Sequence, residues 1–299
     1  MMSDRKEVVL LTGASGFIGH NIAPILRERF QLLTPTRKEL NLLDAQAVEE
    51  YIKQNKVEYI VHTANPNGQK NEEDAKASML DASLRCFMNL VRMQDWVEKI
   101  LYIGSGAEFD KRLDMMQVME EEFGRSIPDT EYGFAKYVMN AFAHDSQKIF
   151  NLRIFGCYGP GDYYTKFITH CINSIKANQD ITIRQDCYFD YIQVQDLARV
   201  IEYALTHELK YHDYNVCSGQ PILLSEIAEK VINVYKANVD SGIHTQIEIL
   251  QDGMNKAYTG NNFRLMNELS KHIPDFKWIS YEEGIRMQIQ AMENEPVIP

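Results

Sequence analysis

Tyr132 and Lys136 stand four positions apart in a stretch that we expect to be helical, so their side chains lie one turn apart on the same face. A cation close to a phenol favours the phenolate and lowers the pKa of the tyrosine, which suits it to donate or accept a proton. This spacing is common by chance. Here the pair follows a strand-like run that ends at Ser105. The order of these residues makes the proton-transfer prediction more specific than the pair alone.

A glycine-rich turn near the start of the chain indicates a cofactor for such chemistry. The apolar run Val8–Leu11 leads into glycines at G-x-x-G-x-x-G spacing, and an apolar helical pattern follows. Glycine lets the backbone approach a pyrophosphate without a Cβ clash, and a helix N-terminus offers free N–H groups. The alternative is a glycine-rich turn without a ligand, but its place between strand and helix favours a dinucleotide. The residues of this turn predicted to bind the cofactor are Gly13, Ser15, Gly16, Phe17, Ile18 and Gly19.

The residues after the second predicted strand, Phe30–Thr34, bear on the choice of dinucleotide. In dinucleotide-binding folds this strand ends at the adenosine ribose, where an acidic residue selects NAD. Arg37 could instead pair with a 2′-phosphate through its planar fork, which favours NADP over NAD; the alternative is a surface arginine. Asn41 and Leu42 are placed to flank the adenine, and Ala64 is a further predicted cofactor contact.

Alternating strands and helices must position these residues. After the first strand, turn and helix, we expect strands over 30–34, 58–64, 99–106 and 151–155 and helices over 45–54, 74–97 and 132–148, with Asp44 as an N-cap. This alternation predicts a parallel sheet with helices on both faces, an α/β fold of the doubly wound Rossmann type. His62 is read as a packed strand-end residue rather than a catalytic one.

The second half of the chain is less regular. We expect helices over 167–177, 196–206, 224–237 and 281–292, strands over 180–184, 188–194, 214–216 and 246–250, and an acidic loop with some helix over 111–130. Ser225 is the predicted cap of the helix over 224–237. The expected division is a Rossmann domain over 1–156 and a smaller, irregular α/β substrate domain over 157–299, with the segment 188–206 returning to the Rossmann domain.

Composition excludes several classes of partner. The 299 residues carry a formal charge of −11, which argues against nucleic acid and anionic membranes as partners. The five cysteines form no C-x-x-C pair, which suits free thiols in a reducing compartment and gives no metal signature. No apolar run approaches the roughly 18 residues of a membrane span, and no signal peptide is recognisable, so we expect a cytoplasmic protein.

At these motifs the chain resembles the extended short-chain dehydrogenase/reductase family, in the branch that modifies nucleotide-activated sugars. The turn Thr12–Gly19 matches the family's fingerprint, and the resemblance covers the whole chain. Segments 153–161 and 190–196 resemble the family's "R-x-F-x-x-Y-G-P-G" and "R-D-F-I-H-V-D-D" motifs. Segment 37–44 is especially similar to that of the GDP-fucose synthases, which use NADPH. The residues that fall on the family's catalytic triad are Ser105, Tyr132 and Lys136.

The departures from the family pattern concern the substrate. Ala107 stands where dehydratases carry the glutamate of "T-D-E" and where GDP-fucose synthases carry the cysteine used for epimerisation, so neither dehydration nor 3,5-epimerisation is supported. Phe189 replaces an arginine that grips the substrate pyrophosphate, and Gly156 replaces the usual asparagine. Lys166, near the position of an acid histidine, could protonate a substrate. The predicted substrate-binding residues are Glu108, Lys166, Arg184, Tyr188 and Arg264. For the three cations among them, the alternative is an ordinary surface charge that binds no substrate.

The resemblance implies hydride transfer at a sugar carbon, usually C4. Tyr132 would protonate the resulting oxygen, Lys136 would lower the pKa of the tyrosine and hold the nicotinamide ribose, and Ser105 would hydrogen-bond the oxyanion. The leading interpretation is reduction of a 4-keto nucleotide sugar with NADP or NAD as cofactor. The alternatives are a nucleotide-sugar 4-epimerase with tightly bound NAD, a cofactor-sensing or scaffold protein without turnover, and a small-ketone or aldehyde reductase. The resemblance also implies a homodimer through the long helices.

Overall fold

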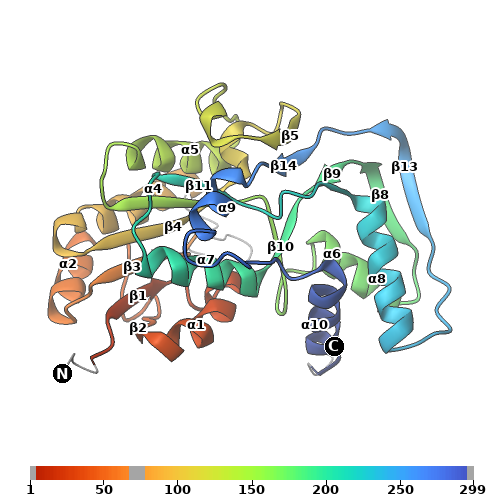
Figure 1. The fold of residues 1–299 in the computed structure, drawn as a ribbon, viewed down its shortest axis with the longest axis horizontal. Coiled ribbons are helices and arrows are strands. Elements are labelled where there is room, and N and C mark those ends of the chain that lie inside the picture. Colours follow the sequence, from red (N-terminus) through yellow and green to blue (C-terminus); the bar gives the residue numbers. More distant parts are fainter. Residues whose placement is uncertain (1–4, 67–77, 295–299) are drawn as a thin grey trace.

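A six-stranded sheet organises one end of the molecule in the computed structural model, which describes residues 5–66 and 78–294 (Figure 1). All its neighbouring strands are parallel, in the order β11-β6-β4-β3-β1-β2. The strands are β1 (Val8–Thr12), β2 (Gln31–Leu33), β3 (Tyr59–His62), β4 (Lys99–Ser105), β6 (Ile149–Ile154) and β11 (Asp213–Val216). The predicted Rossmann-type α/β fold is therefore confirmed.

Helices cover both faces of this sheet because the side chains of each strand alternate between them. In β1, Val9 and Leu11 pack on one face and Leu10 packs on the other. The helices are α1 (Phe17–Arg29) and α7 (Val194–Thr206) on the first face, and α2 (Ala45–Gln54), α4 (Met79–Val91) and α5 (Glu131–Ala143) on the second. Two apolar cores thus fix the plane of the sheet, and with it the level at which the strands end.

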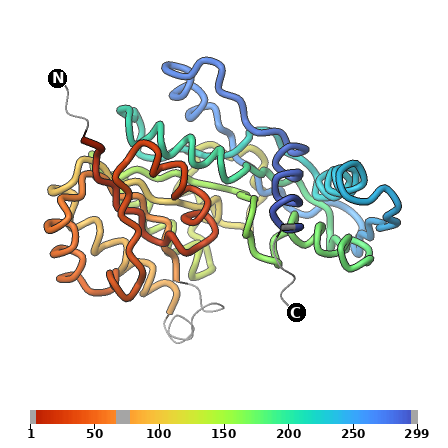
Figure 2. The backbone as a smooth tube through the Cα atoms, turned by 90° about the horizontal axis from the view of Figure 1, so that it is seen from below, coloured from red at the N-terminus to blue at the C-terminus, as the bar shows by residue number. Residues whose placement is uncertain are grey.

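A second body of structure lies at the opposite end of the molecule, as Figures 1 and 2 show. Helices α6 (Phe167–Lys176), α8 (Leu224–Asn238) and α10 (Tyr281–Asn294) pack with the parallel strands β8 (Ile181–Asp186) and β13 (Ile247–Met254). Ile172, Ile183, Val231 and Ile285 are central to the apolar core of this body.

Short strands from distant parts of the chain connect the two bodies. A four-stranded sheet has the order β12 (Ile222–Leu223), β9 (Tyr188–Phe189), β14 (Tyr258–Gly260) and β5 (Met115–Val118). β10 (Tyr191–Gln193) pairs with β7 (Gly156–Tyr158), and α9 (Phe263–Leu269) contacts β11 of the large sheet. Phe109, Phe155 and Tyr258 form part of a small apolar cluster here. The chain therefore crosses between the two bodies several times.

Local sequence signals predicted most of the helix and strand boundaries. Asp44 caps α2, accepting hydrogen bonds of 3.0 Å from the backbone N–H groups of Gln46 and Ala47, as expected. Ser225 is not a cap: α8 begins after Leu223, and the Ser225 hydroxyl donates to Asp186. The predicted helix over 74–97 begins outside the described residues, and its described part is α4 followed by the 3-10 turn η1 (Gln94–Trp96).

Two further differences concern the segment that carries the catalytic candidates. The helix of Tyr132 ends at Ala143 instead of residue 148, because Ser146 turns the chain by accepting from Lys148 N and donating to Gln94. The region predicted as an acidic loop contains β5 between the 3-10 turns η2 (Gly106–Phe109) and η3 (Glu120–Glu122).

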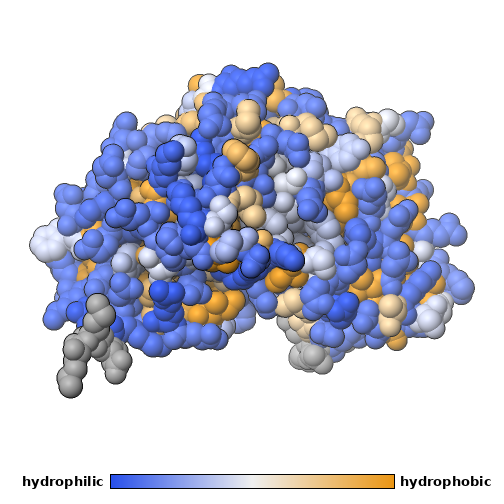
Figure 3. Space-filling model, viewed as in Figure 1, coloured by the Kyte–Doolittle hydropathy of each residue, from blue (hydrophilic) through white to orange (hydrophobic). Residues whose placement is uncertain are grey.

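The face of the molecule in Figure 3 is mainly hydrophilic, with hydrophobic residues in separate patches. Across residues 5–66 and 78–294, none of the helices combines the length and the apolar character needed to cross a membrane.

Candidate active site

The glycine-rich turn joins the carboxyl end of β1 to α1 and requires glycine for its shape. Gly13 has a φ of +76°, in the left-handed region, and a Cβ on it would lie 2.6 Å from the Cα of Ala64. Gly16 is the N-cap of α1 and supplies no side-chain hydrogen bond, so the first N–H groups of the helix keep their capacity to bind a ligand. An exposed backbone turn followed by the positive end of a helix fits a pyrophosphate.

A cleft of about 1620 Å³ extends from this turn to the second body. It is lined by residues 12–20, 34–37, 40–43, 63–66, 154–158 and 165–168 together with single residues from other segments. Every predicted cofactor-binding residue lines this cleft except Lys136, which is buried beneath it. The glycine turn, Arg37, Asn41, Leu42 and Ala64 thus share one wall.

The three predicted catalytic residues lie close together at this cleft. Ser105 ends β4, and Tyr132 stands in the first turn of α5, which Thr130 caps by accepting from Gly133 N. The Ser105 hydroxyl lies close enough to Tyr132 to act on the pKa of its phenol, which it lowers. The Lys136 ammonium donates to the carbonyl oxygen of Ile103 at 2.7 Å and lies 6.0 Å from the centre of the Tyr132 ring.

Gly133 explains why α5 can begin so near the end of β4. A Cβ at this position would lie 2.9 Å from the carbonyl oxygen of Ala107, the second residue after the end of β4. Glycine between Tyr132 and Lys136 therefore permits the close approach that brings Tyr132 to Ser105. Gly133 stands between Tyr132 and Lys136 in the sequence, but the four-residue spacing of that pair did not show why a glycine is needed there.

Burial dominates the pKa values of the pair. It lowers the pKa of Lys136 to about 8, against the opposing charge of Glu108. Burial raises the pKa of Tyr132, while the hydrogen bond from Ser105 opposes the rise and Glu108 adds to it. The expectation that Lys136 brings the pKa of Tyr132 towards neutral is wrong for the protein by itself, because the ammonium is directed to Ile103 and desolvation is the larger effect.

His62 lies beneath the glycine turn and is only 2% exposed. Its Nδ1 is 2.8 Å from the Thr12 hydroxyl, which connects the ends of β3 and β1. Burial, with a smaller contribution from the charge of Lys136, lowers the pKa of His62 to about 3. The interpretation of His62 as a packed strand-end residue is confirmed.

Glu108 is buried in the protein interior and does not line the cleft, which differs from its predicted contact with substrate. It accepts from the backbone N–H of Ser105 at 2.9 Å and from Arg153 Nε at 2.9 Å. Arg153 is fully buried and also donates to Asp213 at 2.7 Å. Glu108 therefore supports the serine from behind and is itself held by a buried ion pair.

Of the other predicted substrate-binding residues, Lys166 lines the cleft and three do not. Arg264 forms ion pairs with Asp213 and Glu121 and lies over the ring of Tyr211, away from the cleft. Arg184 on β8 and Tyr188 on β9 are exposed and lie outside the lining. The acidic partners of Arg264 are distant in sequence, so the resemblance alone could not place it.

The cleft also contains residues that the sequence prediction missed, among them Lys111, Asp162 and Tyr258. Burial and the neighbouring charge of Lys166 lower the pKa of Lys111. Burial raises the pKa of Asp162 to about 7, against a hydrogen bond from Tyr163 N and the charge of Lys166. Asp162 directly follows segment 153–161, which resembles the family motif, but Lys111 and Tyr258 lie near or in the strands β5 and β14, whose pairing the sequence did not predict.

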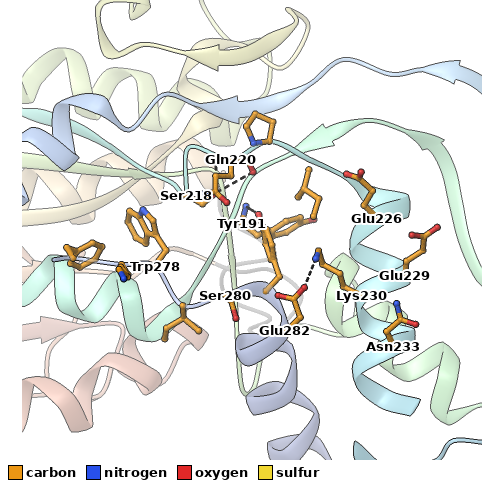
Figure 4. Close-up of a pocket in the computed structure, with 16 residues that line it drawn as sticks. Tyr191, Ser218, Gln220, Glu226, Glu229, Lys230, Asn233, Trp278, Ser280 and Glu282 are labelled. Carbon is orange, nitrogen blue, oxygen red and sulfur yellow. Dashed lines mark hydrogen bonds and ion pairs between the residues drawn. The ribbon is translucent and has the colours of Figure 1, made fainter. Parts of the chain in front are cut away.

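A second hollow, of about 840 Å³, lies between α8, the start of α10 and residues 276–280 (Figure 4). Figure 4 shows Lys230 pointing to Glu282, with which it forms an ion pair. Tyr191 lines both this hollow and the large cleft. Within the described part of the chain, none of the predicted site residues lines it, so the large cleft is the candidate active site.

Comparisons with known proteins agree with this geometry. Residues 9–217 match the model of a family described as the NAD dependent epimerase/dehydratase family. This range includes the glycine turn and the three catalytic candidates. An ADP-L-glycero-D-manno-heptose-6-epimerase of Pseudomonas paraeruginosa is 24% identical over 281 residues, covering 82% of this chain and 84% of that protein.

Solved structures share the whole fold. A GDP-L-fucose synthetase from Naegleria fowleri bound to NADP has a TM-score of 0.80 at 15% identity, covering 98% of this chain and 96% of the other. A GDP-mannoheptose C4 reductase from Campylobacter jejuni with NADP bound has a TM-score of 0.78 at 19% identity, covering 98% and 100%. At these identities the likeness shows a common architecture.

Proposed function

The chain belongs to the NAD dependent epimerase/dehydratase family, and on this premise we propose that it reduces the 4-keto group of a nucleotide-activated sugar with NADPH. The observation that carries the proposal is the convergence of Ser105, Tyr132 and Lys136 on the cleft that also contains the glycine turn. The GDP-mannoheptose C4 reductase with NADP bound, which has the same architecture, supports this choice of reaction.

The cofactor half of the cleft fits a dinucleotide with a 2′-phosphate. The turn at Gly13 and the first N–H groups of α1 suit the pyrophosphate. Residues Thr34, Pro35, Thr36 and Arg37 line the wall after β2, where NAD-selective folds place a carboxylate. A guanidinium in this place supports NADP over NAD.

The protein's own groups handle the proton. When held in the cleft, a reduced nicotinamide would supply hydride to the carbonyl carbon. Tyr132 gives its phenolic proton to the carbonyl oxygen as that oxygen becomes negative, and the O–H of Ser105 donates a hydrogen bond to the same oxygen. Lys136 lies buried behind Tyr132, and to stabilise the phenolate that remains its ammonium would have to turn from the Ile103 carbonyl oxygen towards the phenol.

Two lysines form the proposed phosphate grip in the substrate half. Lys166 and Lys111 both line the cleft, and the charge of Lys166 lowers the pKa of Lys111, so the two ammonium groups are close enough to repel each other. Within residues 5–66 and 78–294, no ion pair joins either lysine to a carboxylate. A diphosphate would neutralise both cations, which offsets the loss of the family's arginine at Phe189.

The first test combines binding with turnover. Thermal unfolding is measured with NADP, NAD and a set of nucleotide sugars, because a ligand that binds the native state raises the melting temperature. We expect a larger rise with NADP than with NAD, and a loss of this preference in Arg37→Ala. Consumption of NADPH with a 4-keto nucleotide sugar then tests the reaction, and stabilisation by NAD alone would contradict the proposed cofactor.

A nucleotide-sugar epimerase is the second candidate, favoured by the match to a heptose 6-epimerase over most of both chains. The same serine, tyrosine and lysine would then remove a proton from a hydroxyl and later return it. The two reactions differ in stoichiometry. A reductase consumes one NADPH per product, whereas an epimerase converts one sugar into its isomer without net loss of cofactor.

The proposal includes a homodimer formed through α5. Phe142 on this helix is 40% exposed, which supports an apolar contact there. Sedimentation of the wild type and of Phe142→Glu tests the assembly, and we expect the variant to shift towards monomer.

A further inference from the structure

Tyr258 brings a second phenol to Ser105 from the other end of the chain. It stands on β14, only 7% exposed, and lines the cleft. Its hydroxyl lies 3.4 Å from the Ser105 Oγ. Ser105 is therefore between two phenols, Tyr132 from α5 and Tyr258 from β14, and the proposed reaction uses only the first.

The direction of the hydrogen bonds follows from the available partners. The backbone N–H of Ala107 donates to the Ser105 Oγ at 3.2 Å. A buried hydroxyl needs an acceptor for its own hydrogen. Either hydroxyl of the Ser105–Tyr258 pair can donate at this distance; in the arrangement that we infer, Tyr258 donates, which leaves the Ser105 hydrogen for another partner.

This arrangement sets the direction of the Ser105 O–H bond. With Ala107 and Tyr258 both donating to its oxygen, the serine has its accepting positions occupied. Its own hydrogen is then available to Tyr132, whose pKa the Ser105 hydroxyl lowers, and to the cleft. Burial raises the pKa of Tyr258, so this phenol stays protonated and keeps donating through the neutral and moderately alkaline range.

The ring of Tyr258 is held in place by packing that also explains Phe189. The Phe189 ring lies 5.0 Å from that of Tyr258 and 4.8 Å from that of Tyr191, between the two. Phe155 packs on another side of the ring at 5.4 Å, and the Lys111 ammonium lies 4.6 Å from its centre. The family's arginine position is thus used here to support Tyr258.

We propose that Tyr258 is a positioning residue of the reaction, whose hydroxyl turns the Ser105 proton towards Tyr132 and the substrate oxygen. This inference rests on the proposed function for its catalytic meaning, but its geometric content does not need a substrate. Because the contact of 3.4 Å is long for an O–H···O bond, the expected effect is modest.

The first experiment needs no substrate. Tyr258→Phe removes the hydroxyl and keeps the ring packing, and Tyr203→Phe is the matched control, since this buried tyrosine of α7 donates to Glu268 O at 2.8 Å outside the cleft. The pKa of Tyr132 is measured by NMR on protein with Cζ-labelled tyrosine and assigned with Tyr132→Phe. We expect Tyr258→Phe to raise the pKa of Tyr132 by about half a pH unit, because the Ser105 hydroxyl is then no longer fixed as a donor to Tyr132. Tyr203→Phe should leave it unchanged.

The second experiment measures turnover of a 4-keto nucleotide sugar with NADPH. Tyr258→Phe should lower kcat about tenfold with little change in the KM of the cofactor. If Tyr258 acts through the serine, Ser105→Ala and the double variant Ser105→Ala/Tyr258→Phe should be equally slow. The inference would be overturned if the two substitutions lowered kcat by factors that multiply in the double variant, or if the pKa of Tyr132 were unchanged in Tyr258→Phe.

The two proposals fail separately. If the wild type reduces none of the sugars and the pKa of Tyr132 still rises in Tyr258→Phe, the proposed reaction is wrong and the role of Tyr258 in orienting Ser105 stands. If NADPH is consumed and the pKa does not rise, the reaction stands and the inference about Tyr258 is wrong. Melting temperatures of all variants check that each protein is folded.

Discussion

The two halves of the cleft are built in different ways. The cofactor half consists of backbone at the ends of parallel strands, with Gly13 fixed against Ala64 and α1 starting at the turn. The substrate half consists of side chains from short strands and loops that are distant in sequence, such as Lys111, Phe189 and Tyr258. A phosphate-binding turn depends on local backbone geometry, whereas a sugar site depends on long-range packing. Substrate specificity can therefore change while the cofactor half stays the same.

Ser105 and Tyr132 lie where the two halves meet, and removing the proton donor there should have the largest effect. We expect Tyr132→Phe to lower kcat by about a thousandfold, because the reaction loses its general acid. The matched control is Tyr137→Phe on the same helix, whose ring stacks on Phe123 outside the cleft. NADPH consumption under single-turnover conditions measures the effect. Comparable rates in Tyr132→Phe and Tyr137→Phe would assign the chemistry to another residue.

Two glycines with the same backbone angle compare the halves directly. Gly13 in the cofactor half has a φ of +76°, and Gly161, in the loop next to the cleft residue Asp162 of the substrate half, has a φ of +75°. An alanine Cβ would lie 2.6 Å from Ala64 Cα at the first position and meets nothing within 4 Å at the second. We expect Gly13→Ala to lower the free energy of unfolding by about 3 kcal/mol, from strain and overpacking together, and Gly161→Ala by about 1 kcal/mol.

Urea unfolding measures both glycine variants, and NADP binding is measured alongside. Gly13→Ala should lose cofactor affinity, whereas Gly161→Ala should retain it. Equal destabilisation by the two substitutions would show that the turn can relax away from β3, and would contradict the rigid cofactor half.

Buried titratable groups give the halves opposite responses to pH. The pKa of His62 is lowered to about 3, so the unfolded chain binds more protons and His62 costs stability as the pH falls from about 6.5. The pKa of Asp162 is raised to about 7, so the folded state binds more protons and stability from this group falls as the pH rises from about 4 to 7. His62 contributes on the order of 2–3 kcal/mol between pH 6.5 and 4.5, and partly exposed Asp162 contributes less.

Denaturant unfolding at several pH values separates the two groups. In His62→Gln the free energy of unfolding should rise less steeply with pH than in the wild type, because the histidine term is absent. In Asp162→Asn it should rise more steeply. The signs of the two slope changes test the assignment, and a change in the same direction in both variants would contradict it.

The same contrast explains how much the sequence could predict. The strands of the large sheet, the Asp44 cap and the grouping of Ser105, Tyr132 and Lys136 follow from periodicity and from strand ends that share one edge. The pairing of β5 with β14 joins segments about 140 residues apart, one of them three residues long, and carries no local signal. Arg264 was misplaced for the same reason, because its carboxylate partners come from distant segments.

Replacing a lysine of the substrate half should have the smallest effect on the reaction. It should also distinguish most clearly between the substrate half and the cofactor half of the cleft. Lys166→Ala and Lys111→Ala should each raise the KM for a nucleotide sugar about tenfold, by removing a charge from the diphosphate. The dissociation constant of NADP should not change. Lys176→Ala is the matched control, because this lysine ends α6, pairs with Glu293 and lies outside the cleft.

Salt distinguishes a charge contact from a change in shape. If Lys166 and Lys111 bind phosphates, raising the ionic strength should weaken substrate binding in the wild type more than in either variant. The double variant should also have a higher KM for the nucleotide sugar than either single variant, since each cation neutralises part of the same dianion. A rise in the NADP dissociation constant without a change in substrate KM would place the lysines on the cofactor, and the separation of the cleft into two independent halves would then be wrong.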